Sequence, residues 1–199
     1  MAHYFTKENN ELESKVHRFK CFVGEKEYTF STDLGVFSKK GLDFGTRLLL
    51  ETILSDPSGP VLDLGCGYGP IGIILADRWK ESITMVDINR RALELTRTNA
   101  ALNKVAPAIL ESDGFDNVSG WFSLIVTNPP IRAGKQTYYK WFDDSRSYLA
   151  LDGRLVFVMR KDQGANSAIA YLQDLFGSVS ILRKKSGYFI ISCQNPLTI

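Results

Sequence analysis

One short segment of the chain joins an amide side chain to two consecutive prolines. Residues 127 to 135 read TNPPIRAGK, directly after the apolar run at 122–126. Each proline holds its own φ at about −65° and keeps the preceding residue out of the helical region. We therefore expect the side-chain oxygen of Asn128 and the carbonyl oxygen of Pro129 to be two rigid acceptors. An ordinary turn is the alternative, because Asn and Pro are both common in turns.

A second segment, DLGCGYGPIG at 63–72, is rich in glycine. Glycine allows a sharp turn and lets a ligand approach the backbone, and the helix that follows offers free N–H groups. The spacing is GxGxG, whereas a dinucleotide fingerprint needs GxGxxG. Asp63 precedes Gly65 by two residues, where a carboxylate would repel a pyrophosphate. The segment therefore favours a nucleoside ligand with a cationic end over NAD, and it makes an NAD oxidoreductase a distant alternative.

Two further acidic residues follow predicted strands. Asp87 lies 22 residues after Gly65, where an acidic side chain can accept hydrogen bonds from both ribose hydroxyls. Asp113 can accept from an adenine amino group, and Phe115 can pack on the ring. The alternatives are a charge at a helix N-terminus for Asp87 and a polar turn for Asp113.

Alternating strands and helices must position these residues. Pro70 suits the first turn of a helix, and Asn89 can cap the next one. Strands are expected at 60–65, 82–87, 106–110, 122–127 and 153–159, and helices at 70–79, 90–103, 136–150 and 166–176. Such alternation implies right-handed crossovers and a parallel sheet.

The C-terminal part of the chain departs from this alternation. Only Lys185 and Ser186 separate the expected strands at 178–184 and 187–193, so these strands must pair antiparallel. The expected fold is α/β, Rossmann-like and doubly wound. Its mostly parallel seven-stranded sheet ends in a C-terminal antiparallel hairpin.

The N-terminal part is expected to form a small hairpin and a helix. Alternating runs flank Gly24 within 20–30, a short extended piece is expected at 35–37, and helical spacing covers 41–54. At 199 residues and 44% hydrophobic content, we expect one domain. Residues 1–54 form its hairpin and helix extension, and residues 55–199 form its ligand-binding core.

Charge, cysteine content and the apolar runs argue against several classes of protein. The net charge of +2 and the pI of about 8.4 favour anionic partners only weakly. Cys21, Cys66 and Cys193 are scattered, so we expect no metal site and no disulfide framework. The start lacks the apolar core of a signal peptide, and no apolar run is long enough for a bilayer. A soluble cytoplasmic protein with no membrane partner is expected.

Together these motifs resemble class I S-adenosylmethionine-dependent methyltransferases across about residues 34 to 193. VLDLGCGYG resembles the first motif of that family, MVDIN the acidic second motif and ESDGF the adenine-side motif. The resemblance implies S-adenosyl-L-methionine as the cofactor. It places Asp63 and the 65–69 loop at the methionine end, Asp87 at the ribose and Asp113 at the adenine amine. The cofactor-binding residues that it implies are Asp63, Gly65, Cys66, Gly67, Gly69, Asp87, Ile88, Asp113, Gly114, Phe115 and Asn128.

The NPP segment resembles the amino-methylating subgroup, whose motif is Asn/Asp-Pro-Pro-aromatic. The implied catalytic residues are Asn128, Pro129, Pro130 and Ile131. Ile131 departs from the motif because it is not aromatic. We therefore expect another ring, from Phe37, Tyr138 or Tyr139, to stack on the target, and adenine or glutamine methylation is disfavoured.

The longer segment NPPIRAGK is similar to the ribosomal RNA small-subunit guanine-N2 methyltransferases, of which this chain resembles the C-terminal catalytic half. This implies methylation of a guanosine 2-amino group in ribosomal RNA or a ribosomal subunit. Phe37, Arg132 and Lys135 are the candidate substrate-binding residues. A protein or small-molecule amine as substrate, or a non-catalytic RNA-binding module, are the alternatives. The sequence leaves the nucleotide and the oligomeric state open.

Overall fold

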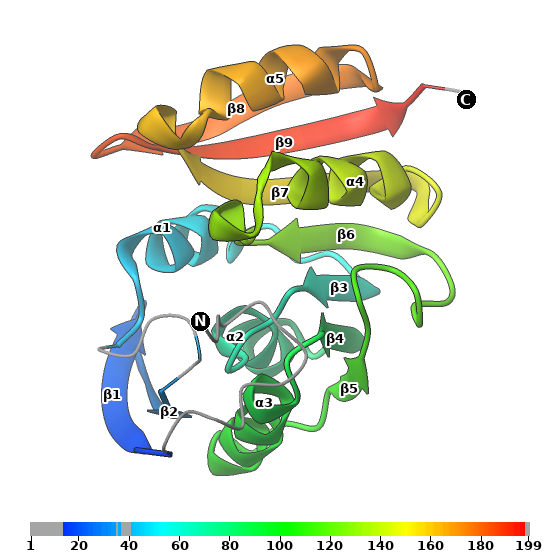
Figure 1. Cartoon of the computed structure of the whole chain (residues 1–199). Helices are drawn as coiled ribbons and strands as arrows, with labels where there is room; N and C mark the ends of the chain where they lie inside the picture. Colours follow the sequence, from blue (N-terminus) through cyan, green and yellow to red (C-terminus); the bar gives the residue numbers. More distant parts are fainter. Residues whose placement is uncertain (1–13, 35, 37–40, 198–199) are drawn as a thin grey trace.

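A seven-stranded sheet forms the centre of the computed structural model, which describes residues 14–34, 36 and 41–197 (Figure 1). Its strand order is β5-β4-β3-β6-β7-β9-β8. The pairs from β5 through to β7 are parallel, and β9 is antiparallel to both β7 and β8. The strands are β3 (Val61–Leu64), β4 (Ile83–Asp87), β5 (Ala108–Glu111), β6 (Phe122–Thr127), β7 (Leu149–Arg160), β8 (Phe176–Lys185) and β9 (Tyr188–Pro196). The expected α/β fold with a C-terminal antiparallel hairpin is confirmed.

Five helices cover the two faces of this sheet. They are α1 (Phe44–Ile53), α2 (Pro70–Trp79), α3 (Arg90–Leu102), α4 (Lys135–Ser145) and α5 (Ala165–Gln173). The first three pack in one core cluster, and α4 and α5 pack in a second cluster on the opposite face. Strand β7 shows the alternation, because Val156 belongs to the first cluster and Phe157 to the second. Asn89 and Pro70 lie at the helix starts as predicted.

Two predicted helices extended too far. The helix expected at 136–150 ends at Ser145, because Leu149 opens β7 and pairs with Phe122. The helix expected at 166–176 ends at Gln173, and Phe176 starts β8. In both places a buried apolar side chain fits helical spacing but lies on a strand.

An N-terminal hairpin packs beside α2 and α3 (Figure 1). It consists of β1 (His17–Val23) and β2 (Lys26–Thr32), as expected around Gly24. The Asn99 side chain on α3 accepts from the Ser31 N–H at 2.7 Å and donates to the Ser31 and Tyr68 carbonyls at 2.9 and 2.8 Å. The hairpin is thereby tied to the glycine loop. The extended piece expected at 35–37 includes Gly35 and Phe37, which lie outside the described residues, and the division at residues 54 and 55 stays a prediction.

The helices of the described chain are short. None of them is long and apolar enough to cross a membrane. The same part of the chain groups no three His, Cys, Asp or Glu side chains as metal ligands.

Candidate active site

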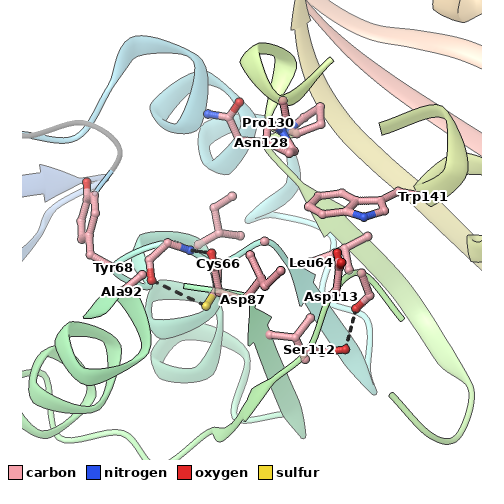
Figure 2. A pocket seen from close by; sticks show the side chains of 18 of the residues that line it. Leu64, Cys66, Tyr68, Asp87, Ala92, Ser112, Asp113, Asn128, Pro130 and Trp141 are labelled. Atoms are coloured by element: carbon pink, nitrogen blue, oxygen red, sulfur yellow. Dashed lines mark hydrogen bonds between the residues drawn. The ribbon is translucent and has the colours of Figure 1, made fainter. Parts of the chain in front are cut away.

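A pocket opens at the carboxyl ends of β3 and β6, where the strand order reverses direction. Open α/β sheets bind ligands at such a switch point. Figure 2 shows Asn128 and Pro130 on one side of this pocket, Trp141 on a second, and Asp87 and Cys66 below them. Its lining residues are Val36, Thr46, Leu64, Gly65, Cys66, Gly67, Tyr68, Pro70, Ile71, Val86, Asp87, Ile88, Ala92, Ser112, Asp113, Gly114, Asn128, Pro129, Pro130, Ala133, Thr137 and Trp141.

The loop from Gly65 to Gly69 depends on the freedom of glycine. Gly65, Gly67 and Gly69 have φ of 72°, 60° and 92°, in the left-handed region that favours glycine. A Cβ on Gly69 would lie 2.8 Å from Ile73, whereas a Cβ on Gly67 would meet nothing within 4 Å. The backbone at Gly67 is therefore open to a ligand at the N-terminal end of α2.

Cys66 also lines the pocket, but its thiol is buried. Burial, with the charges of Asp87 and Asp63, raises the pKa of the Cys66 thiol well above its ordinary value. The side chain therefore serves as a small apolar wall and has little thiolate character.

Asp87 stands at the end of β4, and its half-buried carboxylate lines the pocket. One oxygen accepts from the Gly67 N–H at 2.8 Å, and the other accepts from the Asn89 N–H at 2.8 Å. Burial raises the pKa of Asp87 to about 6, although these hydrogen bonds act against it. The Ile88 N–H also hydrogen-bonds this carboxylate, so three of its roughly four acceptor positions are used and it can accept one more hydrogen bond from the pocket side. Ile88, the next residue, lies beside it in the lining.

The prediction that Asp63 lines the pocket is wrong. The carboxylate is fully buried beneath the loop, where Oδ2 accepts from the Gly72 N–H at 2.8 Å. Its Oδ1 has no partner within the described chain. Burial, and then the negative charge of Asp87, raise the pKa of Asp63 to about 7. Asp63 ends up inside because it lies on β3, which is flanked by β4 and β6 and buried on both faces.

The segment after β5 contributes Asp113 and Gly114 to the pocket, but not Phe115. Phe115 is buried in the second core cluster and stacks on Tyr148 at a centroid distance of 4.6 Å. The expected packing of Phe115 on an adenine ring is therefore wrong, because the chain turns at Gly114 and directs the next side chain into the core.

The aromatic ring that lines the pocket beside Asp113 and Gly114 is that of Trp141 on α4. A Cβ on Gly65 would lie 2.8 Å from its Cη2, and a Cβ on Gly114 would lie 2.8 Å from its Nε1. The indole therefore lies against both glycines, and either side chain would displace it. In the sequence, Trp141 has the spacing of an ordinary core residue, so only the position of α4 above the loop identifies it.

Asn128 and Pro129 lie at the end of β6, with Asn128 half-buried in the pocket wall. The Asn128 Nδ2 donates to the Thr46 Oγ1 on α1 at 3.0 Å. The carboxamide oxygen of Asn128 has no partner within the described chain. Thr46 is itself buried, and its backbone N–H is held by the Asp43 cap at 3.1 Å. The start of α1 thus orients the amide, a role that the sequence did not reveal.

Pro130 is the centre of a tight turn. Its φ of −77° and ψ of 75° fit an inverse γ-turn, in which the Ile131 N–H donates to the Pro129 carbonyl at 2.9 Å. This bond uses one lone pair of the carbonyl and leaves the other available. Pro129 and Pro130 both line the pocket.

The other predicted site residues lie outside this lining. Ile131 packs against the second core cluster, and Tyr138 and Tyr139 pack on each other at 5.2 Å. Arg132 and Lys135 are exposed, with the Lys135 ammonium 4.6 Å from the Tyr139 ring centroid. Ile131 is not grouped with Asn128 because the 3-10 turn η1 (Ile131–Ala133) turns it away. Phe37 lies outside the described residues.

The strand order, the glycine loop after β3 and the Asn-Pro-Pro segment after β6 define a class I S-adenosylmethionine-dependent methyltransferase. S-adenosylmethionine (AdoMet) is the cofactor of that class. The model of one family, described as the methyltransferase small domain, matches residues 27–192, and the chain belongs to this family.

One curated relative matches this chain over nearly its whole length, and others match it over less than half of their own length. The uncharacterized protein YbxB of Bacillus subtilis (strain 168) is 43% identical over 199 residues, which are 98% of this chain and 99% of that protein. The ribosomal RNA small subunit methyltransferase C of Pasteurella multocida is 36% identical over 168 residues, which are 80% of this chain but 49% of that protein. That of Aeromonas hydrophila is 42% identical over 130 residues, 65% of this chain and 38% of that protein. The chain thus spans half or less of these curated methyltransferases.

A solved methyltransferase structure has the same fold as this chain over about half of its own length. The 16S rRNA N2 methyltransferase RsmC of T. thermophilus, in complex with AdoMet and guanosine, superposes with a TM-score of 0.83 at 26% identity. The superposition covers 92% of this chain and 52% of that one.

Proposed function

We propose that this protein transfers a methyl group from AdoMet to the exocyclic N2 amine of a guanosine in ribosomal RNA. The observation that supports this most directly is the anchored amide of Asn128. Its Nδ2 is bound to Thr46, its oxygen is unpaired within the described chain, and the Pro129 carbonyl follows it in the same pocket wall.

The residues present fit AdoMet. The open backbone at Gly67 lets a ligand lie against the loop, and the Asp87 carboxylate keeps an acceptor position for a ribose hydroxyl. Asp113 and Trp141 would hold the adenine, through a carboxylate acceptor and a flat ring. The buried carboxylate of Asp63 beneath the loop is negatively charged above its pKa of about 7, and this charge favours a cation above it rather than a pyrophosphate.

The reaction needs an amine nitrogen whose lone pair is free. When bound, AdoMet supplies a methyl group made electrophilic by its sulfonium charge. In our proposal the Asn128 oxygen and the Pro129 carbonyl accept the two N–H bonds of the guanine amine. These acceptors favour a pyramidal nitrogen and stabilise the positive charge that develops on it. A fixed amide also holds the nitrogen in line for attack, so no strong base is needed and a proton leaves after transfer.

The printed functions of the relatives support RNA as the substrate. Two of the curated relatives are ribosomal RNA small subunit methyltransferases, and one solved neighbour is a 16S rRNA N2 methyltransferase with guanosine bound. A protein or small-molecule amine would fit the same pair of acceptors. The non-catalytic alternative is disfavoured because Asp87, Asn128 and the open loop at Gly67 are all present in one pocket.

The test is transfer of labelled methyl to RNA from cells that lack this protein, followed by nucleoside analysis. We expect labelled N2-methylguanosine with the wild type and a loss of at least about a hundredfold in rate with Asn128→Ala, because one preorganised hydrogen bond at the reacting centre contributes on that order. Asn166→Ala, at an exposed position of α5, is the matched control. Equal rates for Asn128→Ala and wild type would refute the catalytic role, and label in another nucleoside would refute the guanine N2 assignment.

A further inference from the structure

A row of cations and aromatic rings lies beside the pocket, at the turn between β8 and β9. In Figure 1 this turn and the start of α1 lie at the same end of the sheet. Arg160, Tyr188 and Lys185 are direct cross-strand partners on β7, β9 and β8, so their side chains share one face of the sheet. The Arg160 guanidinium lies 5.5 Å from the Tyr188 ring centroid.

Lys161 lies next to this row, because its backbone N–H donates to the carbonyl of Gly187 in the β8–β9 turn at 2.8 Å. Lys161 and Lys185 are both exposed. The carboxylates bound to cations here are Asp162, at 2.6 Å from Arg160, and Glu51, at 3.4 Å from Arg183. Asp43, the cap of α1, adds a third carboxylate beside Phe44, where it accepts from the Gly45 and Thr46 N–H groups. Within the described residues no carboxylate forms a salt bridge with Lys161 or Lys185, so these two lysines supply the positive charge that this end of the sheet offers to a ligand.

The row is connected to the pocket by the first turn of α1. Phe44 lies 5.3 Å from the Tyr188 ring, centroid to centroid, and is 39% exposed. A Cβ on Gly45 would lie 2.9 Å from the Tyr188 ring. The next residue, Thr46, is in the pocket wall and holds Asn128. A chain passing over this row would therefore reach the pocket beside Asn128.

We propose that Phe44, Arg160, Lys161, Lys185 and Tyr188, here called the β8–β9 rim, bind single-stranded RNA next to the target nucleotide. The inference rests on the proposed function and specifies its partner surface. Cations that follow a backbone, combined with exposed rings on which bases stack, are the arrangement that binds single strands without reading sequence. Lys161 and Lys185 would contact phosphates, and Phe44 would offer a face for a neighbouring base.

The test measures binding of a labelled single-stranded oligoribonucleotide at several salt concentrations. For Lys161→Gln/Lys185→Gln we expect affinity to fall about tenfold at low salt, and the slope of log K against log salt to become shallower by about 1.4, since each single-strand phosphate contact contributes about 0.7. For Phe44→Leu we expect a loss of at least about fivefold with the slope unchanged, because stacking is lost and charge is not.

The control is Arg97→Gln/Lys104→Gln, which removes two exposed cations on and after α3, beside the opposite edge of the sheet. It should bind RNA like the wild type, and AdoMet affinity by calorimetry should be the same in all variants. If the wild type binds and methylates RNA but the lysine variant binds it equally well, the rim proposal is overturned alone. If the wild type neither binds nor methylates RNA, the proposed RNA substrate fails and the rim proposal fails with it.

Discussion

The buried carboxylate of Asp63 should make the ligand-free protein less stable as pH rises. In the folded protein its pKa is about 7, whereas the ordinary value for an aspartate is 3.8. Between these values the unfolded chain has lost the proton and the folded chain still binds it. Because the folded state binds more protons, the free energy of unfolding falls with increasing pH across this window. The full decrease in the free energy of unfolding is reached only above pH 7.

From pH 5 to pH 8 this single group should cost about 2.5 kcal/mol of stability, at about 1.4 kcal/mol per pKa unit. Asp63→Asn removes the titration while an amide oxygen can still accept from the Gly72 N–H. The assay is urea unfolding of the ligand-free protein at pH 5 and pH 8, with Asp152→Asn as a control at an exposed position of β7. The wild type and Asp152→Asn should lose about 2.5 kcal/mol more between the two pH values than Asp63→Asn does. Parallel losses in all three proteins would refute the reasoning, whatever the absolute stability of the variant.

Three further predictions concern the pocket. Thr46→Val should lower kcat by about tenfold while AdoMet affinity changes little, because the Asn128 amide loses its anchor; Thr46→Ser should restore the rate, and an unaffected Thr46→Val would exclude the anchoring role. Asp87→Asn should weaken AdoMet binding about tenfold or more, and wild-type affinity by calorimetry should fall as pH drops below about 6, where Asp87 becomes protonated; an affinity independent of pH would contradict this. AdoMet should change the tryptophan fluorescence mainly through Trp141, so Trp141→Phe should remove most of the signal.

The parts of the fold with strong local signals could be predicted from the sequence. The alternation of strands and helices, the Asn89 cap and the closing hairpin depend on neighbouring residues, and all were correct. The two helix ends were wrong because Leu149 and Phe176 are buried on strands whose partners lie far away in the chain. Local spacing does not contain that information.

The same distinction applies to the site. The sequence correctly placed Asn128, Asp87 and the glycine loop in one pocket, because each stands at the end of a strand and such ends meet at one edge of a parallel sheet. Phe115 was misplaced because the direction of a side chain after a turn depends on the turn itself. Thr46 and Trp141 gave no signal, since each meets the pocket only through the packing of a helix from elsewhere in the chain.

The Asn99 side chain shows that the N-terminal hairpin and the cofactor loop are not independent modules. One amide satisfies both backbone groups of Ser31 and the carbonyl of Tyr68, which lies inside the glycine loop. A chain shortened to begin after β2 would keep every residue that lines the pocket, yet it would lose the partner that fixes Asn99 and expose the apolar surface beneath the hairpin. The minimal unit able to bind AdoMet is therefore larger than its list of contact residues, and transplanting the 61–193 region alone would transfer the motifs without the support that keeps the loop in place.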